Sequence, residues 1–184
     1  MSEDIFTILD EIITPYFKIQ NSGGVIKIEE KQAPKCKFVE IQTSKKIFAL
    51  SLDQNRNVFN CFEDGVKNIN KKNDAIIFFI KKDSLIVLLI ELKSDNRGKY
   101  LKQLKAGRNF VEYLLRQIDL FYNIKIDPSK IVYRGILFQT QKSPPKGTTR
   151  KEGLYFRDRN GLYCASLACN TMIKLQKIKD SISI

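Results

Sequence analysis

Asp74, Glu91 and Lys93 are the residues whose side chains and spacing point most clearly to chemistry. Two apolar runs, residues 75–80 and 85–90, have the length of strands and are joined by four polar residues, which predicts an antiparallel hairpin. In that hairpin Asp74 faces Glu91, with Cβ atoms roughly 4.5 to 5.5 Å apart. Opposed carboxylates repel each other unless positive charge lies nearby. Lys93 follows Glu91 by two residues, so the pleat of the strand points it to the same face.

A divalent metal ion would satisfy the same demand for positive charge. Asp74 and Glu91 offer hard oxygen ligands suited to Mg²⁺ (or Mn²⁺), which keeps several waters and bridges carboxylates and phosphate. Such an ion polarises a phosphate and lowers the pKa of its bound water. Lys93 can orient or help deprotonate that water and stabilise the transition state. We therefore expect phosphodiester hydrolysis. The alternative is a chance charged strand end, in which Lys93 only pairs with one of the carboxylates.

The composition supports this chemistry and excludes several others. The chain contains no His, which excludes Ser-His-Asp and Cys-His nucleophiles, zinc hydrolases with His ligands and His-dependent nucleases. Its 32 Lys and Arg against 20 Asp and Glu give a net charge of +12. Clustered basic residues release counterions from phosphates on binding, so nucleic acid is the favoured partner. The other interpretation is that the lysines only follow an overall Lys-, Asn- and Ile-rich composition.

Length and apolar content predict a single domain, residues 1–184, since 43% of the residues are hydrophobic. No apolar run approaches the roughly 18 residues that span a bilayer. The acidic N-terminus shows no secretory signal, so we expect a cytoplasmic protein that does not contact a membrane. We expect reduced, mostly buried thiols at the four cysteines, with a four-cysteine zinc site as the less favoured alternative. They are Cys36, Cys61, Cys164 and Cys169.

The remaining patterns predict an α/β fold with a mixed central β-sheet flanked by helices. Helical periodicity begins at Ser2 and ends near residues 15–17, and it recurs over 98–121 and 170–179. Further strands are expected over 25–29, 38–42, 47–52, 131–139, 154–159 and 162–167. The last two form a hairpin about Asn160-Gly161, a favoured two-residue turn. Residues 53–73 and 141–153 are expected to be loops, the second of them mobile and basic.

The spacing of these residues resembles that of a known superfamily. Asp74, sixteen intervening residues and then Glu91-Leu92-Lys93 resemble the motif of the PD-(D/E)xK nucleases, with Asn73 where the family name has Pro. The tripeptide ends an apolar strand, a matching Asp begins the partner strand, and a helix with Gln103 follows. Over residues 70–121, the resemblance implies a restriction-endonuclease-like fold and a Mg²⁺-dependent deoxyribonuclease, with DNA as the preferred substrate.

The same resemblance implies further site residues. The backbone carbonyl of Leu92 would join Asp74 and Glu91 as a metal ligand. Gln103 would lie near the active site, although its inward-turned amide is as well explained by nearby backbone partners. Family members often add a carboxylate from the first helix. The candidates here, among which the helical wheel does not choose, are Glu3, Asp10 and Glu11.

Basic residues flank the expected ligands in sequence and are candidates for contacts with nucleic-acid phosphates. They are Lys72, Arg97, Lys99 and Lys102, joined as candidates by Lys146 and Arg150 on the basic loop expected over 141–153. A solvated lysine-rich face is the competing explanation. Two other functions stay open: a catalytically silent member that binds nucleic acid or builds a larger complex, and a protein-interaction module whose charge is compositional. A homodimer or a partner subunit is compatible with the resemblance, because cutting both strands of a duplex needs two sites.

Overall fold

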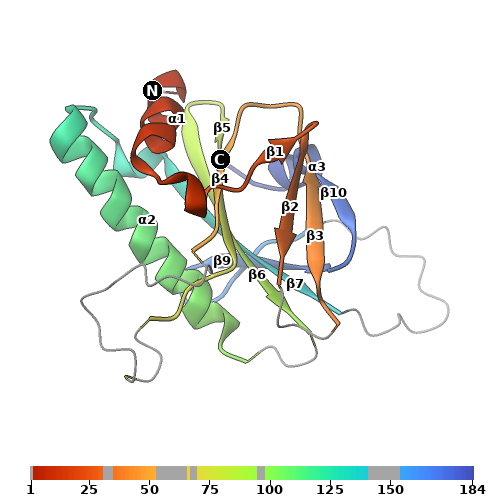
Figure 1. Ribbon diagram of the computed structural model, residues 1–184. Helices are drawn as coiled ribbons and strands as arrows, with labels where there is room; N and C mark the ends of the chain where they lie inside the picture. The colour runs from red at the N-terminus through yellow and green to blue at the C-terminus, as the bar shows by residue number, and fades with distance from the viewer. Residues whose placement is uncertain (1, 31–34, 53–65, 67–69, 95–97, 141–153) are drawn as a thin grey trace.

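A six-stranded mixed sheet runs through the part of the chain that the structure describes (Figure 1). This computed structural model describes residues 2–30, 35–52, 66, 70–94, 98–140 and 154–184, without the side chains of residues 2–4. In spatial order, the strands are β4 (Phe48–Leu50), β5 (Ala75–Lys81), β6 (Ser84–Lys93), β7 (Ile131–Gln139), β9 (Tyr163–Ala168) and β8 (Arg157–Asp158). β6 pairs antiparallel with β5 and parallel with β7, which makes β5 and β6 central strands.

The β5–β6 hairpin has the register that the sequence predicts. Ala75 faces Ile90, and Ile80 faces Leu85. Every side chain from Ala75 to Phe79 and from Ser84 to Leu92 is buried. Uninterrupted apolar runs are typical of strands that are covered on both faces, and the two strands are buried in this way.

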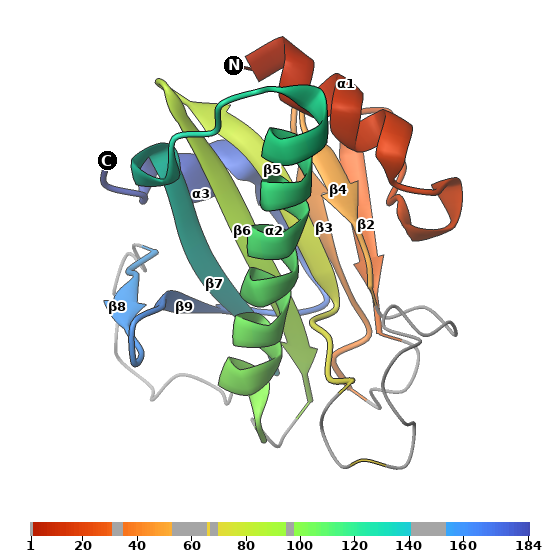
Figure 2. The same ribbon diagram turned by 90° about the vertical axis from the view of Figure 1, so that its left-hand side faces the viewer.

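Helices α1 (Ser2–Ile12) and α2 (Tyr100–Tyr122) cover one face of this sheet (Figure 2). α2 buries residues spaced three and four apart, among them Leu104, Val111 and Ile118, against the sheet. Both helices occur where the periodicity predicts them, although α1 ends at Ile12 and a separate 3₁₀ turn, η1, covers Pro15–Phe17. A second 3₁₀ turn, η2 (Pro128–Lys130), precedes β7. No helix among the described residues is long and apolar enough to cross a membrane.

A second mixed sheet covers the opposite face, where the sequence predicted a single central sheet. In spatial order it contains β1 (Asn21–Ser22), β2 (Val25–Glu29), β3 (Phe38–Gln42) and β10 (Met172–Lys174). Buried and accessible residues alternate along β2 and β3, so each strand has one apolar face. That face packs with Ile86 and Leu88 of β6 in one core cluster. The fold is thus mixed α/β, with two packed sheets.

The C-terminal segment departs from the helix predicted over residues 170–179. Only α3 (Leu175–Asp180) is helical, because the preceding β10 pairs parallel with β3. Asn170 adopts a left-handed backbone conformation, with φ of 55°, before the chain enters β10. Pairing with a remote strand therefore overrides the local helical pattern. The turn at Asn160-Gly161 is confirmed, since both residues have positive φ and the turn joins β8 to β9. The predicted basic loop at 141–153 lies outside the described residues.

Cys36 and Cys169 form a disulfide, so the expectation of four reduced thiols is wrong for this pair. Their Cα atoms lie 5.5 Å apart, within the usual range for a disulfide. A sequence separation of 133 residues gave no local signal of this contact. Cys164 is a buried free thiol, as expected, and burial raises its pKa to about 11. Cys61 lies outside the described residues.

The disulfide predicts a measurable stability difference. Replacing Cys36 and Cys169 together by Ser should lower the free energy of unfolding by about 2 to 5 kcal/mol, because the cross-link restricts the unfolded chain. Urea denaturation without reductant measures this, and wild-type protein in dithiothreitol should lose a similar amount. A tryptic map of the non-reduced protein in which the Cys36 and Cys169 peptides run separately would contradict the assignment.

Candidate functional site

The ends of β5 and β6 carry Asp74, Glu91 and Lys93 on the face that α2 covers. Asp74 lies one residue before β5, and Glu91 and Lys93 are among the last three residues of β6. Val87 and Leu89, on the same side of β6 as Glu91, pack in the helix-covered cluster. Leu92 packs in the cluster on the other side. The hairpin register thus gives the three charged side chains a common face.

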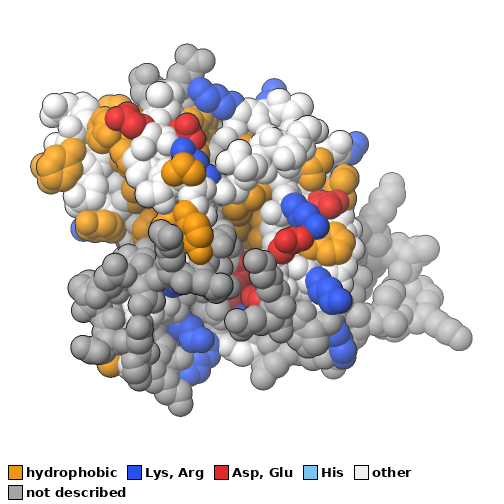
Figure 3. Space-filling view, in the orientation of Figure 1, with side chains coloured by type: hydrophobic (Ala, Val, Ile, Leu, Met, Phe, Trp, Pro, Cys, Tyr) orange, Lys and Arg blue, Asp and Glu red, His pale blue; other side chains and the backbone are white. Residues whose placement is uncertain are grey.

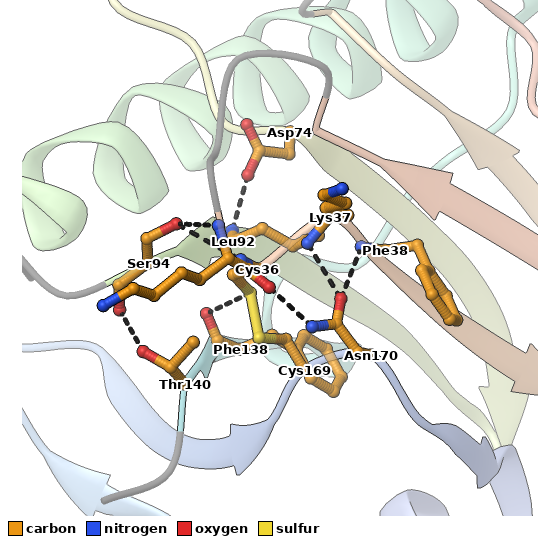
Figure 4. The surroundings of a disulfide bond; sticks show 11 residues. Cys36, Lys37, Phe38, Asp74, Leu92, Ser94, Phe138, Thr140, Cys169 and Asn170 are labelled. Carbon is orange, nitrogen blue, oxygen red and sulfur yellow. Dashed lines mark hydrogen bonds between the residues drawn. A yellow bond between two sulfur atoms is a disulfide. The ribbon is translucent and has the colours of Figure 1, made fainter.

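The Asp74 carboxylate is attached directly to the backbone of β6. Its Oδ2 atom accepts a hydrogen bond from the N–H of Leu92 (Figure 4). The N–H of Asp74 donates to the carbonyl of Ile90 over 3.1 Å. The N–H and C=O of one strand residue point to the same side of the strand, so the Leu92 carbonyl also points toward the side of Asp74.

Burial and charge distinguish these residues from a solvated strand end. Asp74 is 5% exposed, Glu91 is 0% exposed, and Lys93 forms an ion pair with Glu91. Burial lowers the pKa of Lys93. The hydrogen bond and charge of Glu91, with the charges of Asp74 and Glu30, outweigh that effect, so the pKa is raised overall. Lys93 therefore keeps its proton at neutral pH, which favours charge stabilisation over proton acceptance.

The donor set fits a hard divalent cation. Asp74 and Glu91 provide carboxylate oxygens, and Lys93 forms an ion pair with Glu91. The Leu92 carbonyl points to the same side as its N–H, which donates to Asp74. Mg²⁺ is usually held by one or two carboxylates together with waters, so two are sufficient. Among the described residues, no group of three or more His, Cys, Asp or Glu side chains is placed to hold a metal. The described part of the chain therefore offers no zinc site with four protein ligands.

Gln103 positions the strand end through the backbone. Its Nε2 atom donates to the carbonyl of Lys72 over 3.1 Å, which is the backbone contact that the sequence left as an alternative. Asn73 is fully buried, and its Nδ2 atom donates to the carbonyls of Ala75 and Ile90. A Cβ atom on Gly107 of α2 would lie 2.2 Å from Asn73 Oδ1. The first turns of α2 are thus fitted closely to the segment that carries Asp74.

The first-helix carboxylates have separate surroundings. Asp10 is exposed and forms an ion pair with Lys18 over 2.8 Å. Glu11 is also exposed, and the side chain of Glu3 lies outside the described residues. Neither Asp10 nor Glu11, both among the described residues, forms a group with Asp74 and Glu91 that could hold a metal ion.

Some of the residues predicted to contact phosphates lie at the same end of the molecule as Asp74 and Glu91. Lys99 and Lys102 are exposed at the start of α2, and the Gln103–Lys72 hydrogen bond brings this turn beside the half-buried Lys72. In Figure 3, Lys and Arg side chains are spread over the visible face, and some of them lie in the lower half of the view, the end at which β6 finishes and α2 begins. The other three candidates, Arg97, Lys146 and Arg150, lie outside the described residues.

Sequence reasoning missed Lys35 and Lys37. The hydroxyl oxygen of Ser94, next to Lys93, accepts hydrogen bonds from the N–H groups of Lys35 and Cys36, both over 3.2 Å. The Asn170 side chain holds the same segment from the other side, accepting from the N–H of Lys37 over 2.9 Å (Figure 4). Both lysines are exposed, so they add positive charge at the end of the molecule where β6 finishes. Their position near the end of β6 follows only from the long-range contacts of Ser94 and Asn170 with this segment.

The sequence matches no protein-family model, and comparison with curated proteins and with solved structures finds no match. The resemblance to the PD-(D/E)xK nucleases therefore stays a prediction from the motif.

The contact between Gly107 and Asn73 gives a test of how the site is supported. Gly107→Ala should lower the free energy of unfolding by about 1 to 3 kcal/mol through overpacking, although Ala is favoured over Gly in a helix by about 1 kcal/mol. Asn109→Ala, on the exposed face of the same helix, is the control and should not destabilise the protein. Asn73→Ala should make Gly107→Ala less costly, as a double-mutant cycle by urea denaturation would show. A Gly107→Ala variant as stable as wild type would contradict the packing.

Proposed function

We propose that this protein is a metal-dependent nuclease of the PD-(D/E)xK, restriction-endonuclease-like class, with DNA as its preferred substrate. The observation that carries the proposal is the pair of buried carboxylates, Asp74 and Glu91, on one face with a lysine that keeps its charge. Burying two like charges is costly unless they are paired or hold a cation. Lys93 and the Leu92 N–H supply part of that compensation, and a bound cation would add to it. The two-sheet α/β fold is compatible with this class.

Each site residue has a role in the proposed reaction. Asp74, Glu91 and the Leu92 carbonyl would hold Mg²⁺ or Mn²⁺. When bound, that ion would supply an activated water and polarise the scissile phosphate. The Lys93 ammonium would stabilise the negative charge that develops on the phosphate oxygens in the transition state. Gln103 would be a positioning residue, because it holds the Lys72 carbonyl two residues before Asp74.

The charge of the chain supports nucleic acid as the substrate. The net charge is +12, and several lysines lie at the end where β6 finishes. Those among the described residues are Lys35, Lys37, Lys72, Lys99 and Lys102. Contacts of this kind position a backbone without reading its sequence. The preference for DNA over RNA rests on the motif resemblance, and cutting of both strands would call for a homodimer or a partner subunit.

A catalytically silent nucleic-acid-binding protein is the second candidate. Lys93 already forms an ion pair with Glu91, which provides part of the positive charge that a metal would supply. The described residues also bring only two carboxylates to the site as candidate ligands. In this case the same surface would bind nucleic acid without cutting it.

Cleavage assays test the catalytic proposal. With plasmid and single-stranded DNA in Mg²⁺ or Mn²⁺, wild type should cut, and EDTA should abolish cutting. Asp74→Asn and Lys93→Ala should each lower the rate by at least about 100-fold, because each removes a charge from the reacting centre. Lys125→Ala, at an exposed lysine beyond the end of α2, is the matched control and should retain the wild-type rate. Thermal melting of each variant checks that it is folded.

The outcomes separate the candidates. Binding of DNA by wild type and Lys93→Ala without cutting by either protein would favour the silent binder. Cutting by both at equal rates would exclude this site as the catalytic centre. Absence of DNA binding at low salt would favour a protein-interaction module.

Salt dependence of binding tests the predicted nucleic-acid surface. The double variant Lys99→Gln/Lys102→Gln should reduce the slope of log K against log salt by about 2, because each lost phosphate contact releases about one counterion fewer. Lys125→Gln/Lys177→Gln removes the same charge at exposed positions elsewhere and should leave the slope unchanged. Fluorescence anisotropy with a labelled duplex measures both. Equal losses in the two double variants would indicate diffuse attraction without a defined surface.

A further inference from the structure

A concave region lies at the end of the molecule away from Asp74. Its cavity has a volume of about 460 Å³ and lies between the Gly23-Gly24 turn, residues 42–45, the end of β5 and α3. Figures 1 and 2 both show α3 toward the end opposite to the tip of β6. Ile80, which lines the cavity, is six residues along β5 from Asp74. At about 3.3 Å per residue, the two places are roughly 20 Å apart, so this cavity is separate from the candidate nuclease site.

The charge of the cavity wall has one sign. Lys45 and Lys174 are exposed and Lys179 is half-buried, and the described residues that line the cavity include no Asp or Glu. Asp180, the nearest acid along α3, accepts a hydrogen bond from Gln176 over 2.6 Å. Ammonium groups around one concave space repel each other, and a ligand with several negative charges would relieve that repulsion.

Hydrogen bonds order the wall before any ligand binds. The Thr43 hydroxyl oxygen accepts from the N–H of Lys45 over 3.0 Å, and the N–H of Thr43 donates to the Gly24 carbonyl over 2.7 Å. Lys81 donates from its Nζ atom to the carbonyl of Lys179 over 2.8 Å, which fastens the end of α3 to β5. The segments that carry Lys45 and Lys179 are therefore held in place, which reduces the entropy cost of binding.

Size and lining indicate an organic ligand with phosphate groups. The volume falls within the roughly 300 to 1,000 Å³ that is typical of small-molecule sites and greatly exceeds the need of one phosphate ion. Phe79, Ile80 and Leu175 provide an apolar part of the lining, and Ser44 provides an exposed hydroxyl. Gly23 and Gly24, with φ of 59° and 82°, form a turn that lines the cavity without side chains.

From these observations, we propose that the cavity between the β1–β2 turn and α3 binds a phosphorylated small molecule of nucleotide size. Lys45, Lys174 and Lys179 would pair with its phosphates, and the apolar lining would contact its uncharged part. This site is independent of the proposed nuclease function and does not involve Asp74, Glu91 or Lys93.

Calorimetric titration with ATP, inorganic tripolyphosphate and adenosine tests the proposal. ATP should bind wild type more tightly than tripolyphosphate does, and adenosine should not bind. The double variant Lys45→Gln/Lys174→Gln should weaken ATP binding by about tenfold or more, because it removes two of the three charges. Lys99→Gln/Lys102→Gln removes the same charge at the other end and should change the affinity by less than about twofold. Asp74→Asn should bind ATP like wild type, which separates this result from the nuclease assay.

Three results would overturn the proposal. Equal weakening by both double variants would mean diffuse electrostatic attraction. No binding of ATP to wild type up to about 5 mM would mean that the cavity has no such ligand. A short DNA duplex could also displace ATP from wild type and fail to bind the Lys45→Gln/Lys174→Gln variant. That pair of results would assign the cavity to nucleic acid. Thermal melting checks the fold, and the single variant Lys174→Gln replaces the double variant if the latter does not fold.

Discussion

The pairing of β5 with β6 is the constraint on which the rest of the structure depends. Both strands are covered on both faces, so their register determines which side chains enter each core. The same register carries Asp74 and Glu91 into the interior at the end of the hairpin. Buried carboxylates require compensation. Here it comes from the Lys93 ammonium and from the Leu92 N–H, both supplied by β6 itself.

The surroundings of that end are held by polar side chains that bind backbone groups. Gln103 binds the carbonyl of Lys72, Ser94 accepts from residues 35 and 36, and Asn170 binds residues 35, 37 and 38. These contacts join α2, β6 and the start of β3. The disulfide between Cys36 and Cys169 lies between the last two anchors. The candidate site is therefore supported by segments from most of the chain, although its charged residues come from one hairpin.

Lysines lie in two different electrostatic environments at the two ends of β5. At the end where β6 finishes, Lys93 lies beside two buried carboxylates, the arrangement on which the proposed metal and phosphodiester site rests. At the other end of β5, lysines surround a cavity whose described lining contains no carboxylate, an arrangement suited to an anion alone. The net charge of +12 does not distinguish these two environments. The positions of the acidic residues distinguish them.

The sequence by itself determined the hairpin, its register, α1, α2 and the full extent of β7, because each depends on a local pattern of apolar residues. The common face of Asp74, Glu91 and Lys93 follows from the same period of two. Only the tertiary structure decided the second sheet, the strand β10 in place of a helix, the disulfide, and the contact of the segment that carries Lys35 and Lys37 with Ser94 at the end of β6. Each of these comes from pairing between segments far apart in the chain, and such contacts depend on packing that no local period records.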